Sequence, residues 1–98
     1  MEVNGYEWRG KKVLVTGASG FKGGWMCAAL LEMGATVYAT LRDRAHPDSV
    51  FRLLDLEDRV SAVKLDISDR QAVLEAVATI EPDAIFHLAF ASAFAAVF

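Results

Sequence analysis

The sequence is poor in cysteine and proline, and it has neither a long apolar run nor an excess of positive charge. Its single cysteine, Cys27, excludes an internal disulfide framework and, among apolar neighbours, is expected to be a small buried hydrophobe. The formal net charge of -3 offers no electrostatic footprint for nucleic acid or an anionic membrane. The most apolar segment, 84–98, contains His87 and is shorter than the roughly 18 apolar residues of a membrane-spanning helix.

The composition indicates one small globular domain over residues 1–98. Of the 98 residues, 54% are apolar and 23% are charged, which is typical of a folded chain that is neither disordered nor fibrous. Residues 1–10 have no apolar core, so we expect no signal peptide and a cytoplasmic location. We expect no metal site and no nucleic-acid or membrane partner. The apolar tail 90–98 has no clear period and receives no assignment.

Short apolar, mostly β-rich runs alternate with segments of helical periodicity. The runs predict strands at 12–16, 36–41, 60–65 and 84–89. A helix over 21–33 ends at Gly34, a short helix opens at Pro47, and Ser68 with Gln71 forms a capping box for a third helix. The predicted apolar stripes of these helices are Trp25, Met26, Ala29, Leu30 and Met33; Val50, Phe51, Leu53 and Leu54; and Ala72, Val73, Ala76, Val77 and Ile80. The βαβαβαβ order predicts an α/β fold with a parallel sheet and helices on both faces.

The stretch TGASGFKGG, residues 16–24, holds four of the seven glycines between the first strand and the first helix. At such a turn, free backbone N–H groups and the helix dipole favour the pyrophosphate of a dinucleotide. Gly17 would allow the sharp turn, Gly20 the close approach of the phosphate, and Gly23 the packing of helix on strand. Gly24 is interpreted as a close-packing residue only. A glycine-rich connection without a ligand is the alternative.

The end of the second strand carries a charged cluster that bears on the choice of cofactor. Asp43 lies about 20 residues after Gly23, where an acidic side chain can accept hydrogen bonds from ribose hydroxyls and would favour NAD. Arg42 and Arg44 could instead bind the 2′-phosphate of NADP. We therefore expect NAD as the cofactor, with NADP possible, and a solvated charge run is the alternative for Arg44.

These motifs resemble the extended short-chain dehydrogenases/reductases, the group of nucleotide-sugar epimerases and dehydratases. Residues 16–23 resemble the family's TGxxGxxG element, LDI at 65–67 its third-strand end, and FHLA at 86–89 its fourth strand. More narrowly, GFKGGWM with the following EMGATV is similar to CDP-glucose 4,6-dehydratases. TLRDRAHPDS is also similar to NADP-dependent aldehyde or flavonol-type reductases. Phe90 departs from the family, which has a small residue there.

The resemblance implies roles for twelve residues in holding the dinucleotide. The pyrophosphate would lie at the glycine turn, with Lys22 nearby; Arg42 or Asp43 would meet the adenosine ribose; Asp66 and Ile67 would flank adenine; Leu88 and Ala89 would line the ribose side. His87 is interpreted as a structural histidine on a buried strand rather than a catalytic one. The full set of expected cofactor-binding residues is Gly17, Ser19, Gly20, Phe21, Lys22, Gly23, Arg42, Asp43, Asp66, Ile67, Leu88 and Ala89.

The family's catalytic pair is missing from this sequence. The family uses a tyrosine with a lysine four residues later, whose charge lowers the tyrosine pKa for acid–base work during hydride transfer. The tyrosines here are Tyr6 and Tyr38, and the residues four positions on are Gly10 and Arg42. We therefore expect no catalytic residue in this chain and no turnover by the chain alone. A strand order of 3-2-1-4 would still retain the crevice between the first and fourth strands.

The sequence is consistent with three hypotheses. The chain is the N-terminal NAD(P)-binding portion of a nucleotide-sugar dehydratase or epimerase, or the corresponding piece of an NADP-dependent carbonyl reductase. Alternatively, it is a non-catalytic truncated Rossmann module whose exposed fourth strand and apolar tail associate with another copy or another chain. A homo-oligomer or a missing C-terminal part is the expected partner.

Overall fold

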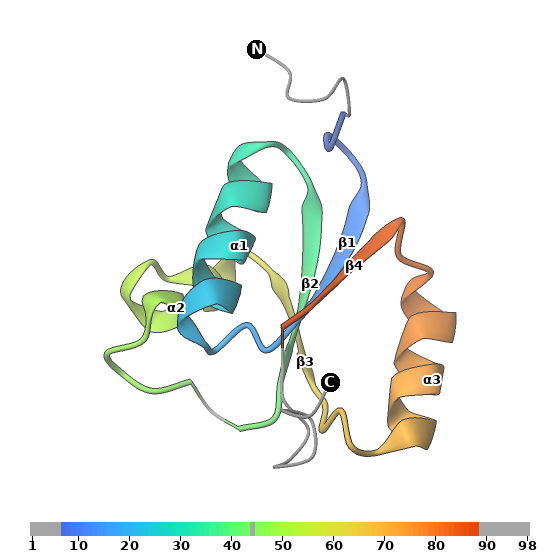
Figure 1. The fold of residues 1–98 in the computed structure, drawn as a ribbon. Coiled ribbons are helices and arrows are strands. Elements are labelled where there is room, and N and C mark those ends of the chain that lie inside the picture. The colour runs from blue at the N-terminus through green and yellow to red at the C-terminus, as the bar shows by residue number, and fades with distance from the viewer. Residues whose placement is uncertain (1–6, 44, 89–98) are drawn as a thin grey trace.

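The computed structural model describes residues 7–43 and 45–88. Within them, strands β1 (Lys12–Thr16), β2 (Thr36–Leu41), β3 (Ser61–Lys64) and β4 (Ala84–His87) form one parallel sheet in the order β3-β2-β1-β4. Helices α1 (Phe21–Glu32) and α2 (Val50–Leu53) lie on one side of the sheet and α3 (Arg70–Ile80) on the other (Figure 1). The predicted α/β fold, its strand order and its helices on both faces are confirmed.

The main hydrophobic core lies between the sheet and the side that carries α1 and α2. Val13 and Val15 of β1 are fully buried there, as are Phe51 of α2 and Leu56 of the short 3-10 helix η1 (Leu56–Asp58). Cys27 of α1 is also fully buried, as predicted, and this burial raises the pKa of its thiol to about 11. A thiol in such a setting is an inert packing group.

The opposite face of the sheet is covered only by α3 within the described residues. Leu14 is buried there, but its in-register neighbour Ile85 on β4 is 50% exposed. The stripe predicted for α3 does face the sheet, yet of its five residues only Ile80 is buried, and the other four are half-buried. One helix therefore covers this face incompletely.

The buried face of α1 differs from the predicted one. Trp25 and Met33 of the expected stripe are 50% and 44% exposed, whereas Gly23, Gly24 and Cys27 are buried. A Cβ at Gly24 would come within 3.0 Å of the Val50 side chain. The helix thus approaches its neighbours so closely that small residues occupy its inner face, while Leu30 is the one member of the predicted stripe that is buried.

The ends of α1 and α3 show one prediction confirmed and one wrong. Gly34 follows α1 at φ 87°, with its N–H bonded to the Leu31 carbonyl, as expected for a C-terminal glycine. The prediction of a capping box at Ser68 is wrong, because Asp69 caps α3 by accepting a hydrogen bond from the Ala72 N–H. Ser68 is instead hydrogen-bonded to Asp66. A carboxylate two residues before a serine competes for its hydroxyl.

The segment after β2 also departs from prediction. Pro47 does not open α2 but lies in the preceding turn, and Ser49 caps the helix through its side chain. This helix is a single turn, so only Phe51 of its predicted stripe is fully buried, and Leu53 is 67% exposed.

The third and fourth strands are shorter than predicted, covering Ser61–Lys64 and Ala84–His87. The expected strand end at Ala89, the departure at Phe90 and the apolar tail lie outside the described residues. None of the helices in the described ranges is long and apolar enough to cross a bilayer.

Candidate functional site

The turn between β1 and α1 is built by two glycines that no other residue could replace without strain. Gly17 has φ 74°, in the left-handed region that side chains disfavour. A Cβ at Gly23 would overlap the Gly17 carbonyl oxygen and come within 2.9 Å of the Ala18 Cα. These observations match the conformational roles predicted for both residues, a sharp turn and a close approach of helix to strand.

Gly20 differs from these two glycines. Its backbone, at φ −78° and ψ 169°, suits any residue, and a Cβ there would meet only the Gly17 carbonyl oxygen, at an ordinary 3.4 Å. The fold itself therefore does not require glycine at this position. A bare backbone here leaves room beside the helix end, which is the property that an approaching phosphate needs.

The N-terminus of α1 has no side-chain cap. Its N-cap residue is Gly20, whereas α2 and α3 are capped by Ser49 and Asp69. The N–H groups of the first turn, those of Phe21, Lys22 and Gly23, have no acceptor within the helix, because the carbonyls four residues earlier lie before the helix begins. The first helical bond runs from the Gly24 N–H to the Gly20 carbonyl. Three backbone donors and the positive end of the helix dipole are thus presented together.

A cleft of about 410 Å³ lies at the carboxyl ends of the strands, beside this helix end. Apart from Thr40 within β2, its lining comes from the segments that follow the four strands, as expected for ligand sites in parallel sheets. The lining residues are Gly17, Ser19, Gly20, Thr40, Arg42, Asp43, His46, Leu65, Asp66, Ile67 and Leu88. Eight of the twelve residues predicted from the sequence therefore meet at one cleft.

The other four predicted residues lie elsewhere. Phe21, Lys22 and Gly23 do not line the cleft, and the side chains of the first two are exposed on the first turn of α1. Only their backbone N–H groups face the end of the helix, so any contact with an anion there would be through the main chain. Ala89 lies outside the described residues.

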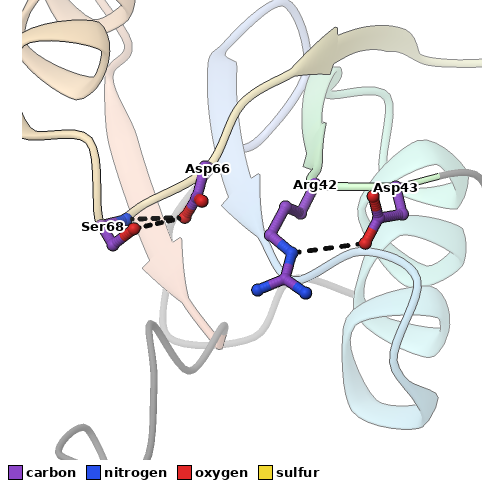
Figure 2. Close-up of polar contacts among 4 residues, drawn as sticks. All are labelled: Arg42, Asp43, Asp66 and Ser68. Carbon is purple, nitrogen blue, oxygen red and sulfur yellow. Dashed lines mark hydrogen bonds and ion pairs between the residues drawn. The ribbon is translucent and has the colours of Figure 1, made fainter.

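Two pairs of polar side chains flank the cleft at the ends of β2 and β3 (Figure 2). At the end of β2, the Arg42 Nε donates to Asp43 Oδ2 over 3.3 Å, with side chains 64% and 77% exposed. An ion pair so exposed contributes little to stability, about 1 kcal/mol or less. The two charges can therefore separate at low cost when a ligand offers better partners.

At the end of β3, the Asp66 carboxylate accepts two hydrogen bonds from Ser68. The Ser68 N–H donates over 3.0 Å and its hydroxyl over 2.7 Å, both to Oδ1. These bonds, with a smaller contribution from the positive charge of Arg42, lower the pKa of Asp66 below its ordinary value. Asp66 is therefore a fixed, ionised acceptor beside the cleft at neutral pH.

The β4 end is tied to the β1 end by a small hydrogen-bond network. The Leu88 N–H donates to Thr16 Oγ1 over 2.9 Å, and the same hydroxyl lies 2.8 Å from His87 Nδ1. His87 is exposed in this structure, because β4 is an edge strand among the described residues, and the expectation of a buried strand is wrong. Its contact with Thr16 fits the structural role that was expected.

Sequence reasoning missed three residues of the cleft, Thr40, Leu65 and His46. Thr40 is 1% exposed, and its carbonyl accepts a hydrogen bond from the Ala18 N–H, which ties the glycine turn to β2. Leu65 and Thr40 could have been found from their position at strand ends. His46 had no signal beyond its place in the loop after β2. Among residues 7–43 and 45–88, no group of three or more His, Cys, Asp or Glu side chains could hold a metal ion.

The chain matches the family model of GDP-mannose 4,6 dehydratase over residues 14–98. It belongs to that family. It is 38% identical over 82 residues to CDP-glucose 4,6-dehydratase of Salmonella typhimurium, which covers 84% of this chain and 23% of the relative. It is 42% identical over 80 residues to dihydroflavonol 4-reductase of Hordeum vulgare, covering 79% of this chain and 22% of the relative. The chain thus spans less than a quarter of the length of these relatives.

Solved structures of similar fold include proteins with a bound dinucleotide. A short chain dehydrogenase from Burkholderia cenocepacia in complex with NADP has a TM-score of 0.66 at 30% identity, over 87% of this chain and 35% of that one. The enzyme WbmH of Bordetella bronchiseptica, in complex with NAD+, has a TM-score of 0.62 at 25% identity, over 85% of this chain and 27% of that one. The family resemblance seen in the sequence is confirmed.

Proposed function

We propose that this chain is the N-terminal, cofactor-binding portion of a cytoplasmic nucleotide-sugar dehydratase or epimerase, similar to CDP-glucose 4,6-dehydratase. The observation that carries the proposal is the uncapped N-terminus of α1, which lies beside a cleft lined by eight of the residues expected to hold a dinucleotide. Family membership and the NAD+ and NADP complexes of similar structures support it.

In this proposal the pyrophosphate lies against the backbone of the α1 N-terminus. The N–H groups of Phe21, Lys22 and Gly23 point toward it, and Gly20 leaves the space for it. Gly17 gives the turn its shape, and Ser19 lines the cleft beside it. The Lys22 side chain, which is exposed, adds a positive charge near the same anion.

The adenosine part occupies the cleft between the ends of β2 and β3. Asp43 or Arg42 meets the ribose, while Asp66 and Ile67 flank adenine. Asp66 suits this role because Ser68 holds its carboxylate in place, and the lowered pKa keeps it an ionised acceptor in mildly acidic solution as well as at neutral pH. Leu88, and Ala89 beyond the described residues, line the ribose on the β4 side.

The chemistry that a bound nicotinamide supplies is reversible hydride transfer. The residues of this chain bind and orient the dinucleotide, and none of them forms the Tyr–Lys pair that the family uses as acid and base. Elimination of water from a nucleotide sugar would therefore need residues that this sequence does not contain, and the 98-residue chain alone would turn over no substrate.

Calorimetric titration of the chain with NAD and with NADP tests the proposal. Binding of at least one of them in the millimolar range or tighter is expected. Gly20→Val should weaken binding about tenfold or more, because a branched side chain would fill the space at the helix end while the backbone angles of Gly20 tolerate it. Leu74→Ala, an exposed position on α3, is the matched control and should bind as the parent does. No binding of either dinucleotide at millimolar concentration would refute the proposal.

A carbonyl reductase is the second candidate for the whole protein. The similarity to dihydroflavonol 4-reductase covers 79% of this chain, against 84% for the similarity to the dehydratase, and Arg42 would suit the NADP that such a reductase would use. Both candidates share the cofactor site, so dinucleotide binding does not separate them. Activity of the longer protein with a nucleotide sugar or with a carbonyl substrate does.

Self-association is a candidate of another class. Ile85 on the edge strand β4 is 50% exposed and lies on the incompletely covered face of the sheet, where a second copy could pair with the strand. Analytical ultracentrifugation of the chain measures this directly. A monomer at high micromolar concentration would argue against a binding module that acts through another copy.

A further inference from the structure

His46 is a cleft residue for which neither the sequence motifs nor the fold provides a role. It follows β2 by five residues, lines the same cleft as Arg42 and Asp66, and is exposed. It packs into no part of the core. It lines the cleft that the proposed function assigns to the dinucleotide, and the inference below rests on that proposed function.

The ring of His46 is held by the turn that contains it. The Asp48 N–H donates to His46 Nδ1 over 3.0 Å. The backbone turn is closed by the Ser49 N–H on the His46 carbonyl at 3.0 Å, with the Ser49 hydroxyl on the same oxygen at 2.7 Å. Pro47 occupies the second position of this turn, where its fixed φ is favoured. The imidazole therefore belongs to a pre-organised loop.

The hydrogen bond to Nδ1 decides which ring nitrogen a ligand can meet. Because Nδ1 accepts a hydrogen bond, the neutral ring carries its proton on Nε2. In the part of the chain that the structure describes, no hydrogen bond involves Nε2. His46 thus presents one N–H donor. Such a donor forms a stronger hydrogen bond with a charged phosphate oxygen than with the neutral hydroxyl of a ribose.

Arg42 supplies the second part of such a site. Only its Nε is bonded to Asp43, at 3.3 Å, while Asp66 is bonded to Ser68 and does not engage the guanidinium (Figure 2). The two terminal nitrogens of Arg42 are therefore available to grip a phosphate at two oxygens. Asp43 would repel a phosphate on its own, but its charge is paired with that of Arg42.

We infer that His46 is a specificity-determining residue for the cofactor, which together with Arg42 contacts the 2′-phosphate of NADP. The cleft then accepts NADP at least as well as NAD. The positive charge comes from Arg42, and the oriented N–H of His46 adds a hydrogen-bond donor. This donor binds a 2′-phosphate more strongly than the 2′-hydroxyl of NAD. This residue lies outside the glycine motif and outside the charged cluster 42–44.

Two substitutions of His46 separate the effect of its Nε2 donor from the effect of the hydrogen bond that Nδ1 accepts within the turn. His46→Asn keeps an acceptor where Nδ1 stands, since an asparagine side chain accepts from the N–H two residues on, but it removes the Nε2 donor. His46→Gln keeps a donor near the position of Nε2 and loses the turn bond. Affinities for NAD, NADP, adenosine 2′,5′-bisphosphate and adenosine 5′-monophosphate are measured by calorimetry on the 98-residue chain, with circular dichroism to compare the folded content.

The expected result is that His46→Asn weakens NADP and adenosine 2′,5′-bisphosphate by about five- to tenfold and leaves NAD and adenosine 5′-monophosphate within about twofold. His46→Gln should retain more of the 2′-phosphate preference than His46→Asn. Equal loss for all four ligands, or no loss for any, would overturn the inference while the proposed function stands. A parent chain that binds NAD but not the 2′-phosphorylated ligands would also overturn it. A parent chain that binds none of the four refutes the proposed function itself.

Discussion

The two faces of the sheet are covered to very different extents. On the face that carries α1 and α2, Val13, Val15 and Phe51 are fully buried. On the face that carries α3, Leu14 is buried but Ile85, its neighbour on β4, is 50% exposed. Since buried apolar area supplies most of the folding free energy, the stability of this chain resides mainly on the α1 side.

The turn between β1 and α1 is supported by the better-covered face of the sheet. Gly17 and Gly23, which shape the turn between β1 and α1, belong to the well-covered face, and their contact is one of backbone against backbone. A ligand site that depends on the positions of backbone N–H groups is thus built on the most buried part of the described chain. The α3 face contributes no residue to the turn.

The largest effect expected from this comparison concerns Phe51 and Ile85. Phe51→Ala should lower the free energy of unfolding by about 3–5 kcal/mol, because the ring is fully buried. Ile85→Ala should lower it by about 1 kcal/mol or less, since half of that side chain is already in water. Urea unfolding followed by circular dichroism measures both. Equal losses for the two variants would contradict the unequal coverage of the faces, and Phe51→Leu provides a milder version should Phe51→Ala not fold.

A smaller difference is expected between two glycines of the turn. Gly23→Ala should destabilise the chain by about 1–3 kcal/mol, because the added methyl group overlaps the Gly17 carbonyl. Gly20→Ala should change the unfolding free energy by no more than about 0.5 kcal/mol, since the methyl group meets ordinary contact distances and an allowed backbone. The same urea titrations report both values. A Gly20→Ala variant as unstable as Gly23→Ala would mean that Gly20 serves the fold rather than a ligand.

Much of the fold was predictable because its signals are local in the sequence. The alternation of strand-like and helical segments predicted the parallel sheet, the Rossmann resemblance supplied its order, and the glycine spacing predicted the turn at Gly17 and Gly23. The buried stripe of α1 was not predictable in this way. Periodicity predicts that large apolar residues form the inner face, but α2 and the Gly17 turn approach so closely that Gly23, Gly24 and Cys27 occupy much of it.

The cleft was predictable to the extent that its residues belong to motifs. Asp43 was expected from its position after a strand and Asp66 from the family resemblance, and both line the cleft. Ser68 was predicted to cap a helix, yet it donates two hydrogen bonds to Asp66. A carboxylate in the same loop is as good a partner for the serine as the backbone at a helix end, and the sequence pattern does not distinguish the two. His46 depends on how the loop after β2 folds back, and neither periodicity nor spacing encodes that path.

The most direct test of the central claim observes the N–H groups at the start of α1. In amide-resolved NMR spectra of the chain, saturating NAD or NADP should shift the resonances of Phe21, Lys22 and Gly23 strongly. The corresponding amides of α3, whose N-terminus is capped by Asp69, should stay unchanged. A dinucleotide that binds the chain yet leaves the first-turn amides of α1 unmoved would contradict the account.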